Sequence, residues 1–359
     1  MYPIFDLRLV KRKMAGIGHV ALNTSFAYQN LYMSNCLVKS GFRDYKFKNQ
    51  LTTTIPGRIF NKLITRTQFL DLYTGNSSLY HSFETFSPKT KLPIIITAHD
   101  FAFLYNENFH KQKIDSQFMK NIQESLNKAS AVIAISKTTK NDLLKNFNIE
   151  KNKIHVVYNG CTIQDSPIER DTNFDYVGSY ILFIGTIEPR KNLLRILKAY
   201  KNLRQRKLIR EKLIIAGQFG WSVSDEEKKE IENFFLRDDI FYVGYVDQNL
   251  KRNLLKRASM LVYISLYEGF GLPVLEALSY GKATLVSNSS ALGEIYSKIS
   301  ETCNPKSVSD ISTGILKVLN SNEIKKNNFL ESERIKFSKE FSWKKTAIEV
   351  RKVHQLILS

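Results

Sequence analysis

The segment ASMLVYISLYEGFGLPVLEALSYG (258–281) contains the parts of an α/β fold in one run. A continuous apolar run ends near Ser265, a glycine-rich turn follows, and Pro273 sits where a helix would start, with Gly281 as its stop. Unbroken apolar runs, rather than alternating ones, fit strands that are covered on both faces. The segment therefore predicts a buried parallel strand that leads through a turn into a helix.

Apolar runs of the same kind recur along the chain. They occupy residues 92–100, 131–136, 153–160, 180–186, 212–218, 240–246 and 282–288. Their alternation with helix-like stretches predicts an α/β fold of parallel sheets and crossover helices. The polar, proline-containing stretch 164–179 is the best candidate for a linker, and 359 residues exceed what one hydrophobic core usually serves. We therefore predict two α/β domains of nearly equal size.

Two glutamates flank the glycine-rich turn of the first segment, Glu268 before it and Glu276 in the expected first turn of the helix. Glycines let backbone N–H groups approach a ligand closely, and a helix N-terminus offers unpaired donors, so the turn suits a phosphate. Glu276 could accept hydrogen bonds from a ribose diol beyond the phosphates, and Glu268 would face the other end of the ligand. The alternative for Glu268 alone is a surface carboxylate on a loop, and the alternative for Glu276 alone is compensation of the helix dipole.

The segment GTIEPRKNLLRILKAY (185–200) places positive charge at the start of another helix. Gly185 closes a strand, and Arg190 and Lys191 stand at or just before the helix, where cations oppose the dipole. Arginine supplies a fork and lysine a mobile point charge, which together suit a diphosphate. A solvated basic turn is the alternative in a chain this basic.

Further candidates lie in the first half of the chain. Gly16 and Gly18 follow the first expected strand, and we expect them in a loop whose backbone passes close to a ligand, although any tight turn favours glycine. His99 and Asp100 are the last two residues of the run 92–100, at the carboxyl end of a strand, where ligands of open α/β sheets bind. A structural histidine and a helix-capping aspartate are the alternatives.

The chain is strongly basic, with a net charge of +19. Residues 1–164 hold 22 basic and 10 acidic side chains, so most of the excess lies in the first half. Such a field suits a nucleic acid, an anionic membrane surface or a phosphorylated substrate. Three separated cysteines argue against a disulfide framework and for a reducing compartment. With no signal peptide and no apolar run of membrane-spanning length, we expect a cytoplasmic protein, peripheral to the inner face of the membrane.

Several catalytic and cofactor motifs are absent. The sequence has no cysteine and histidine spacing of a metal site, no Gly-x-Ser-x-Gly nucleophile and no Walker loop. We therefore expect neither a metal nor a bound cofactor.

In combination, these segments resemble the retaining glycosyltransferases of family 4, which have the GT-B fold, and among them the bacterial mannosyltransferases. The resemblance covers nearly the whole chain in order. Its segments are GIGHV (16–20), YHSF (80–83), ITAHDFAFLY (96–105), AVIAISKTTKNDLL (131–144), KIHVVYNG (153–160), FIGTIEPRKNL (183–193), LIIAGQFGW (213–221), residues 243–288 and FSWKKTA (341–347). The spacing of the two glutamates and the Gly-Thr-x-Glu-Pro-Arg-Lys-Asn run are its specific features.

The resemblance implies a role for each candidate in the second half. Arg190 and Lys191 would bind the diphosphate of a nucleotide sugar donor, and Glu276 the ribose hydroxyls. Glu268 would be catalytic, against the donor sugar and phosphates. The adjoining turn would bind the same groups through Gly269, Phe270, Gly271 and Leu272.

The resemblance also places the remaining candidates. Gly16 and Gly18 would form an N-terminal loop that closes over the diphosphate, and His99 would lie beside the transferred sugar as a second catalytic residue. Gly217 and Val246 would mark the loops that hold the nucleotide base, mainly through backbone groups.

The implied architecture is two Rossmann-like domains that face each other across a cleft. Residues 1–168 would bind the acceptor, residues 169–338 the nucleotide sugar, and a helix in 339–359 would pack back on the first domain. The implied reaction moves a hexose, taken as mannose from GDP-mannose, with retention and without metal, to a glycan or polyprenyl-diphosphate-linked acceptor in bacterial polysaccharide or O-antigen biosynthesis. An anionic membrane surface is the expected setting.

Two other classes remain open. A sugar nucleotide epimerase on the same fold would need no acceptor. A nucleic-acid-binding protein is favoured by the charge alone and lacks an aromatic and basic signature, so we expect no nucleic acid partner.

Overall fold

A computed structural model describes residues 2–7, 10, 16–39, 50–53, 67–74, 76–106, 109, 114–161, 178–220, 223–320 and 324–359. The chain divides into two compact units. Unit 1 comprises residues 1–101, 114–160 and 341–359, and unit 2 comprises residues 102–113 and 161–340. The predicted boundary at 168 lies outside the described residues.

Unit 1 is built on a seven-stranded parallel sheet with the order β3-β2-β1-β4-β5-β6-β7. Its strands are β1 (Tyr2–Asp6), β2 (Asn35–Lys39), β3 (Gln50–Thr53), β4 (Ser77–Ser82), β5 (Ile94–Ala98), β6 (Ala131–Ala134) and β7 (Ile154–Val156). Its helices are α1 (Gly16–Leu31), η1 (Gln68–Leu70), α3 (Asp71–Thr74), α4 (Ser116–Lys128), α5 (Lys137–Asn146), η4 (Lys151–Lys153) and α13 (Trp343–Leu358).

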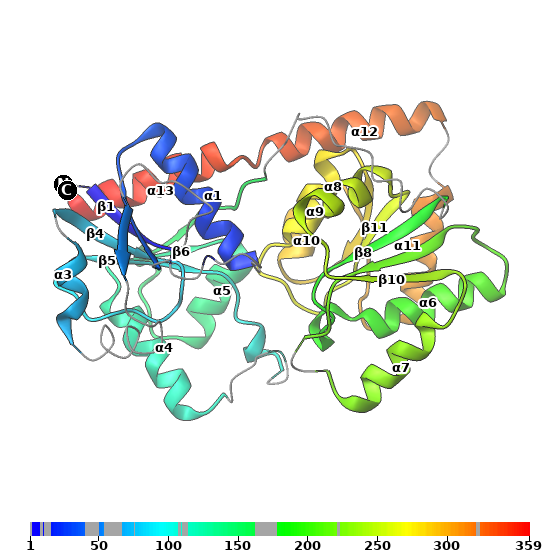
Figure 1. Ribbon diagram of the computed structural model, residues 1–359, viewed down its shortest axis with the longest axis horizontal. Helices are drawn as coiled ribbons and strands as arrows, with labels where there is room; N and C mark the ends of the chain where they lie inside the picture. Colours follow the sequence, from blue (N-terminus) through cyan, green and yellow to red (C-terminus); the bar gives the residue numbers. More distant parts are fainter. Residues whose placement is uncertain are drawn as a thin grey trace. The chain divides into compact units, whose positions relative to one another are not determined.

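The C-terminal helix α13 packs on unit 1, beside α1 on one face of its sheet (Figure 1). Buried polar groups join it to the strands. Nδ1 of His81 on β4 lies 3.0 Å from Nε2 of His354 on α13, and Nδ1 of His354 lies 3.2 Å from the hydroxyl of Tyr28 on α1. Helices α4 and α5 lie on the opposite face of the sheet.

Unit 2 is built on a six-stranded parallel sheet with the order β10-β9-β8-β11-β12-β13. Its strands are β8 (Tyr180–Ile184), β9 (Lys212–Ala216), β10 (Ile240–Gly244), β11 (Met260–Tyr263), β12 (Ala283–Ser287) and β13 (Glu301–Cys303). Its helices are η2 (Ala102–Leu104), η6 (Pro189–Lys191), α6 (Leu193–Gln205), α7 (Asp225–Phe235), α8 (Gln248–Arg257), α9 (Leu272–Ser279), α10 (Ser290–Tyr296), α11 (Val308–Asn320) and α12 (Ile324–Lys339).

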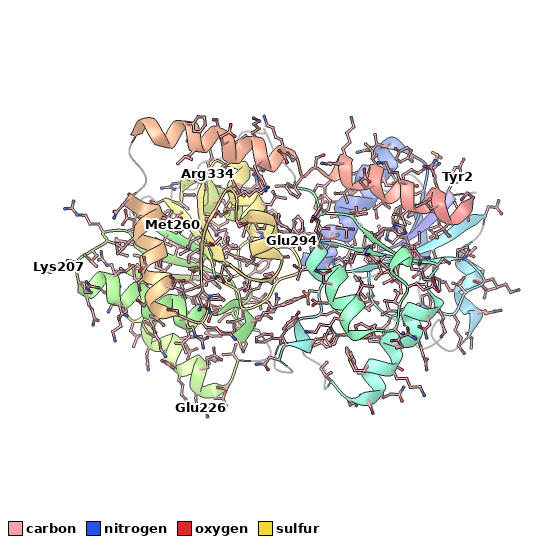
Figure 2. The ribbon with its side chains drawn as sticks, turned by 180° about the vertical axis from the view of Figure 1, so that it is seen from behind. Tyr2, Lys207, Glu226, Met260, Glu294 and Arg334 are labelled. Atoms are coloured by element: carbon pink, nitrogen blue, oxygen red, sulfur yellow. The ribbon has the colours of Figure 1, made fainter. Side chains whose placement is uncertain are left out.

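The core of unit 2 forms because its strands are apolar on both faces. Helices α6, α7 and α11 bury their apolar sides on one face of the sheet, and α8, α9 and α10 lie on the other (Figure 1). Figure 2 shows Met260 within the sheet and Lys207 and Glu226 at the periphery. All eight apolar runs of the sequence, including the one that ends near Ser265, form strands as predicted. The fold class is confirmed.

Candidate functional site

Three glycines with positive φ end the neighbouring strands β8, β9 and β10: Gly185 (φ 154°), Gly217 (φ 151°) and Gly244 (φ 65°). The amide of Gly217 donates to the carbonyl oxygen of Gly244 at 2.6 Å. A Cβ on Gly217 would lie 1.9 Å from the carbonyl oxygen of Gly185, so a side chain does not fit there. The glycines leave backbone without side chains at this edge of the sheet, where a ligand can approach closely. Val246, the other predicted base-binding position, is half-buried between β10 and α8.

Arg190 and Lys191, at the end of η6, converge on Glu268 in the loop after β11. Nζ of Lys191 lies 2.5 Å from Oε1 of Glu268, and NH1 of Arg190 lies 2.9 Å from Oε2. NH2 of Arg190 also lies 2.7 Å from Oε1 of Glu188, and Lys191 donates to the hydroxyl of Tyr263 at 2.6 Å. We call these five residues the buried ion cluster, because its charged side chains are at most 15% exposed.

The charges of the buried ion cluster balance, with two cations against two carboxylates. Burial by itself would raise the pKa of Glu268, but the positive charges of Arg190 and Lys191 outweigh burial and lower that pKa to about 2. Burial, and then the charge of Glu268, raises the pKa of Tyr263 well above its ordinary value, so Tyr263 keeps its proton. The anion that the sequence predicted beside the two cations is, in this structure, Glu268.

Asn192 explains why the two loops meet. It adopts the left-handed conformation (φ 61°), which asparagine tolerates better than most residues. Its side-chain amide donates to the carbonyl oxygens of Ile264 at 3.0 Å and of Pro305 at 2.7 Å. The amide of Leu266 donates to the carbonyl oxygen of Arg190 at 2.8 Å. These bonds tie the loop after β8 to the end of β11.

The buried ion cluster lies where the strand order of unit 2 reverses. From β8 the chain continues outward to β9 and β10, and it then returns to β11 on the other side of β8. In open α/β sheets, ligands bind outside the carboxyl ends of the strands at such a reversal. Arg190 follows β8 and Glu268 follows β11, so the predicted site residues stand on both sides of it.

The glycine-rich turn leads into α9 as predicted. Gly271 (φ 90°) precedes the helix, and a Cβ there would lie 2.5 Å from Cδ2 of Leu292. Phe270 is 3% exposed, so the turn offers a ligand backbone rather than the phenylalanine ring. Gly269 is also buried, and Leu272 is the first helical residue.

The expected position of Glu276 in the first turn of α9 is wrong. The helix begins at Leu272 because Gly271, in its left-handed conformation, ends the turn there, so Glu276 lies in the second turn. Oε1 of Glu276 lies 2.7 Å from Nζ of Lys251 on α8. Oε2 is buried and has no hydrogen-bond partner among the described residues.

In unit 1, His99 follows β5 as predicted and is buried. Burial lowers the pKa of His99 to about 4, although the charge of Asp100 opposes it, so the ring is neutral near pH 7. Nε2 of His99 accepts or donates no hydrogen bond within the described part of the chain. The backbone carbonyl of His99 accepts from the hydroxyl of Thr139 at 3.3 Å.

The predicted loop position of Gly16 and Gly18 is wrong, because α1 begins at Gly16 and includes both residues. Their amides therefore belong to the first turn of a helix, where N–H groups lack an intrahelical acceptor. No Cβ contact within 4 Å is found for Gly16 among the described residues. The packing of the described residues around Gly16 would therefore allow a side chain at that position.

Sequence reasoning did not identify Asn192, Tyr263 or Lys251. The position of Asn192 directly before α6 was a usable signal, since asparagine adopts the left-handed conformation more readily than most residues. Tyr263 lies within an apolar strand and reads as core, and Lys251 reads as a solvated helix residue. Within the described ranges, no three His, Cys, Asp or Glu side chains gather as metal ligands. None of the described helices is long and apolar enough to cross a bilayer.

Comparison with known proteins places this fold in a class. Across 99% of this chain and 100% of the other, the structure superposes on Anabaena Alr3699/HepE in complex with UDP-glucose, with a TM-score of 0.74 and 15% identity. A glycosyltransferase from Rickettsia africae gives a TM-score of 0.71 at 14% identity over 100% of this chain and 99% of that one. The fold is GT-B, that of a two-domain glycosyltransferase.

Residues 167–335 match the family model of glycosyl transferases group 1, and residues 47–165 match that of glycosyltransferase family 4. The chain belongs to the family 4 glycosyltransferases with the GT-B fold. It is 29% identical to O-antigen chain mannosyltransferase B of Escherichia coli, over 78% of this chain and 74% of that protein. It is 26% identical to O-antigen chain mannosyltransferase RfbU of Salmonella typhimurium, over 58% and 56%.

Proposed function

We propose that this glycosyltransferase moves a mannosyl group from GDP-mannose to a glycan or polyprenyl-diphosphate-linked acceptor during assembly of a bacterial polysaccharide such as O-antigen. The transfer retains the anomeric configuration and uses neither a metal nor a bound cofactor. The choice of mannose and of O-antigen rests on the names of the similar E. coli and S. typhimurium proteins.

The observation that carries the proposal is the convergence of Arg190 and Lys191 at the strand reversal of unit 2. The leaving group in such a transfer is a nucleoside diphosphate, and its departure is helped most by fixed positive charge. A guanidinium and an ammonium held within one cluster supply that charge when the diphosphate shares or displaces their partner Glu268, and the N-terminus of α9 adds backbone donors. In the proposed reaction, positive charge fixed by the protein stabilises the leaving diphosphate, as a divalent cation does in other transferases.

The three strand-end glycines support a nucleotide rather than a simple phosphate. They leave a bare backbone edge next to the buried ion cluster, since Gly185 directly follows β8 and the cluster begins three residues later, at Glu188. A planar base can lie against such an edge, and backbone groups can read its polar rim. Gly217 and Val246 are the positions that we propose for this contact.

Retention follows, in the proposed reaction, from attack on the face that the diphosphate leaves. A phosphate oxygen of the leaving group takes the proton of the acceptor hydroxyl, so no enzymic nucleophile is required. Glu268 then acts electrostatically beside the sugar, since its pKa of about 2 keeps it ionised. His99, neutral at pH 7, would contact the transferred sugar through its unpaired Nε2.

A direct assay tests the proposal. The purified chain is incubated with GDP-mannose and a synthetic polyprenyl-diphosphate-linked glycan in anionic vesicles, with and without EDTA, and the product is analysed by NMR for its anomeric configuration. We expect mannose transfer with retention that EDTA does not abolish. Inversion of the anomeric configuration would overturn retention, and loss of transfer with EDTA would overturn the metal-independent reaction. An altered sugar formed from the donor alone would overturn transfer itself in favour of an epimerase.

Two variants connect that assay to the site. Arg190→Ala and Lys191→Ala should each lower GDP affinity at least tenfold, since a hydrogen bond to a charged group contributes about 1.5–3 kcal/mol. Lys198→Ala is the matched control, because Lys198 lies on α6 with its side chain 45% exposed. Equal affinity of all three variants for GDP would remove the cationic site from the proposal.

A further inference from the structure

The ion pair between Lys251 and Glu276 joins two different helices. Lys251 is the fourth residue of α8 and Glu276 the fifth residue of α9, and the two charged atoms are 2.7 Å apart. A cation in the first turn of a helix opposes the helix dipole, so α8 itself gives no reason for a lysine there. The reason for the lysine lies in its partner on α9.

Lys251 uses only part of what the Glu276 carboxylate can accept. An ionised carboxylate has about four lone-pair sites, and the ammonium of Lys251 occupies one of them on Oε1. Oε2 accepts no hydrogen bond from any residue that the structure describes. The Glu276 side chain is 27% exposed, whereas Oε2 itself is buried. A buried polar atom without a partner is rare in folded proteins, and the hydroxyl of a bound ligand would supply the missing donor.

The neighbours of Glu276 do not compete for it. Ser279 donates its hydroxyl to the backbone carbonyl of Glu276 at 2.7 Å, not to the carboxylate. The thiol of Cys161 stays protonated, because burial and then the charge of Glu276 raise its pKa to about 12. Lys251 is therefore the charged group that fixes the direction of the carboxylate.

We propose that Lys251 is a positioning residue that holds the Glu276 carboxylate so that its remaining lone pairs accept hydrogen bonds from the ribose hydroxyls of the nucleotide donor. The inference rests on the proposed function and adds to it the role of Lys251 and a preference for nucleotides with ribose hydroxyls. A mobile carboxylate would have to be ordered when the nucleotide binds, and an ion pair formed beforehand removes that cost. Lys251 acts through Glu276 and has no contact of its own with the nucleotide.

The test compares nucleotides that differ only in ribose hydroxyls. GDP, 2′-deoxy-GDP and 3′-deoxy-GDP are titrated calorimetrically into the wild-type chain and into Lys251→Met, Lys251→Arg and Lys256→Met. Lys256 is the matched control, since it is exposed on the same helix. Where the wild-type chain prefers UDP, the corresponding UDP series replaces these probes.

We expect the wild-type chain to prefer GDP over at least one deoxy form by about tenfold or more, the effect of one hydrogen bond to a charged group. Lys251→Met should weaken GDP by a similar factor and leave that deoxy nucleotide nearly unaffected, so that the preference falls toward one. Lys251→Arg should restore the preference, and Lys256→Met should keep it. An equal loss for all three nucleotides, or no change, would overturn the proposal.

A second comparison separates positioning from direct contact and from folding. In a Glu276→Gln background, Lys251→Met should cause no further loss of ribose preference. A further loss would mean that Lys251 binds the nucleotide itself, which overturns the positioning role. If Lys251→Met does not fold, Lys251→Gln, which keeps a hydrogen-bond donor without the charge, is measured in its place.

Different results would refute the proposed function and the role of Lys251. A wild-type chain that binds no nucleoside diphosphate at millimolar concentration refutes the proposed function. A wild-type chain that binds GDP while Lys251→Met keeps its ribose preference refutes the role of Lys251 alone.

Discussion

Replacing Glu268 with glutamine should destabilise unit 2, because it removes one of the two carboxylates that balance two buried cations, the one that pairs with both of them. Lys191 and Arg190 lie 2.5 and 2.9 Å from its two oxygens. The pKa of Glu268 is lowered from 4.5 to about 2, which corresponds to about 3 kcal/mol in favour of the ionised form. Glutamine has the shape of the protonated acid, so we expect a loss of about 3 kcal/mol at pH 7, the lower end of the range for breaking a buried ion pair.

The same ion pairs predict a pH dependence with a definite sign. The pKa of Glu268 is lower in the folded than in the unfolded chain, so its stabilisation is present above about pH 4.5 and is lost as the pH falls toward 2. The free energies of unfolding of the wild-type and Glu268→Gln chains should therefore differ most near neutral pH and converge near pH 2.

Tryptophan fluorescence allows unit 2 to be followed by itself. The sequence has two tryptophans, of which Trp221 falls in unit 2 and Trp343 in unit 1. Urea unfolding is measured in a Trp343→Phe background from pH 7 to pH 2.5. Glu230→Gln is the control, since Glu230 pairs with Lys198 at the surface and should change stability by less than about 1 kcal/mol. A difference for Glu268→Gln that stays constant with pH, or that equals the control, would refute the electrostatic account.

Three further predictions concern single contacts. Tyr263→Phe removes the hydroxyl that accepts a hydrogen bond from the ammonium of Lys191. The affinity for GDP, measured by calorimetry, should then fall about three- to tenfold, and an unchanged affinity would contradict this. Gly217→Ala places a Cβ 1.9 Å from the carbonyl oxygen of Gly185. The free energy of unfolding of unit 2, measured in urea, should fall by more than about 2 kcal/mol. A smaller loss would mean that the ends of β8 and β9 can move apart. Burial lowers the pKa of His354 from 6.5 to about 3, so unit 1 should lose stability as the pH falls from 6.5 toward 3. Unfolding followed by Trp343 fluorescence should show a weaker pH dependence for the double variant His81→Phe/His354→Leu than for the wild-type chain.

The strands and the fold class could be predicted because a strand covered on both faces needs a run of apolar residues, and that requirement is local in sequence. Helix starts were less accurate. The helix start was expected at Pro273, one residue too late, which put Glu276 in the first turn instead of at the start of the second. The left-handed conformation of Gly271, which sets that start, is a property of the turn and of its packing on Leu292. Gly16 and Gly18 were expected in a loop because a glycine pair after a strand reads the same in a loop and in a first helical turn.

The candidate site could be predicted as a set of residue types but not as a set of contacts. Arg190 and Glu268 were both identified, yet 78 positions separate them in the sequence. Their pairing depends on β8 and β11 being neighbours in the sheet, which no local pattern specifies. Tyr263 was missed for the same reason, since its hydroxyl matters only once Lys191 lies beside it.

The strand order also explains why the cations of this site carry a counter-ion of their own. The reversal at β8 brings the loop after β8, with its two cations, against the loop after β11 at the buried edge of the sheet. Two like charges at such a depth would destabilise unit 2 without an anion. Glu188 supplies one carboxylate from the same loop, and Glu268 supplies the other from the facing loop. In the proposed reaction the donor diphosphate must therefore share or displace Glu268, so that donor binding and the placement of this carboxylate beside the transferred sugar become one event.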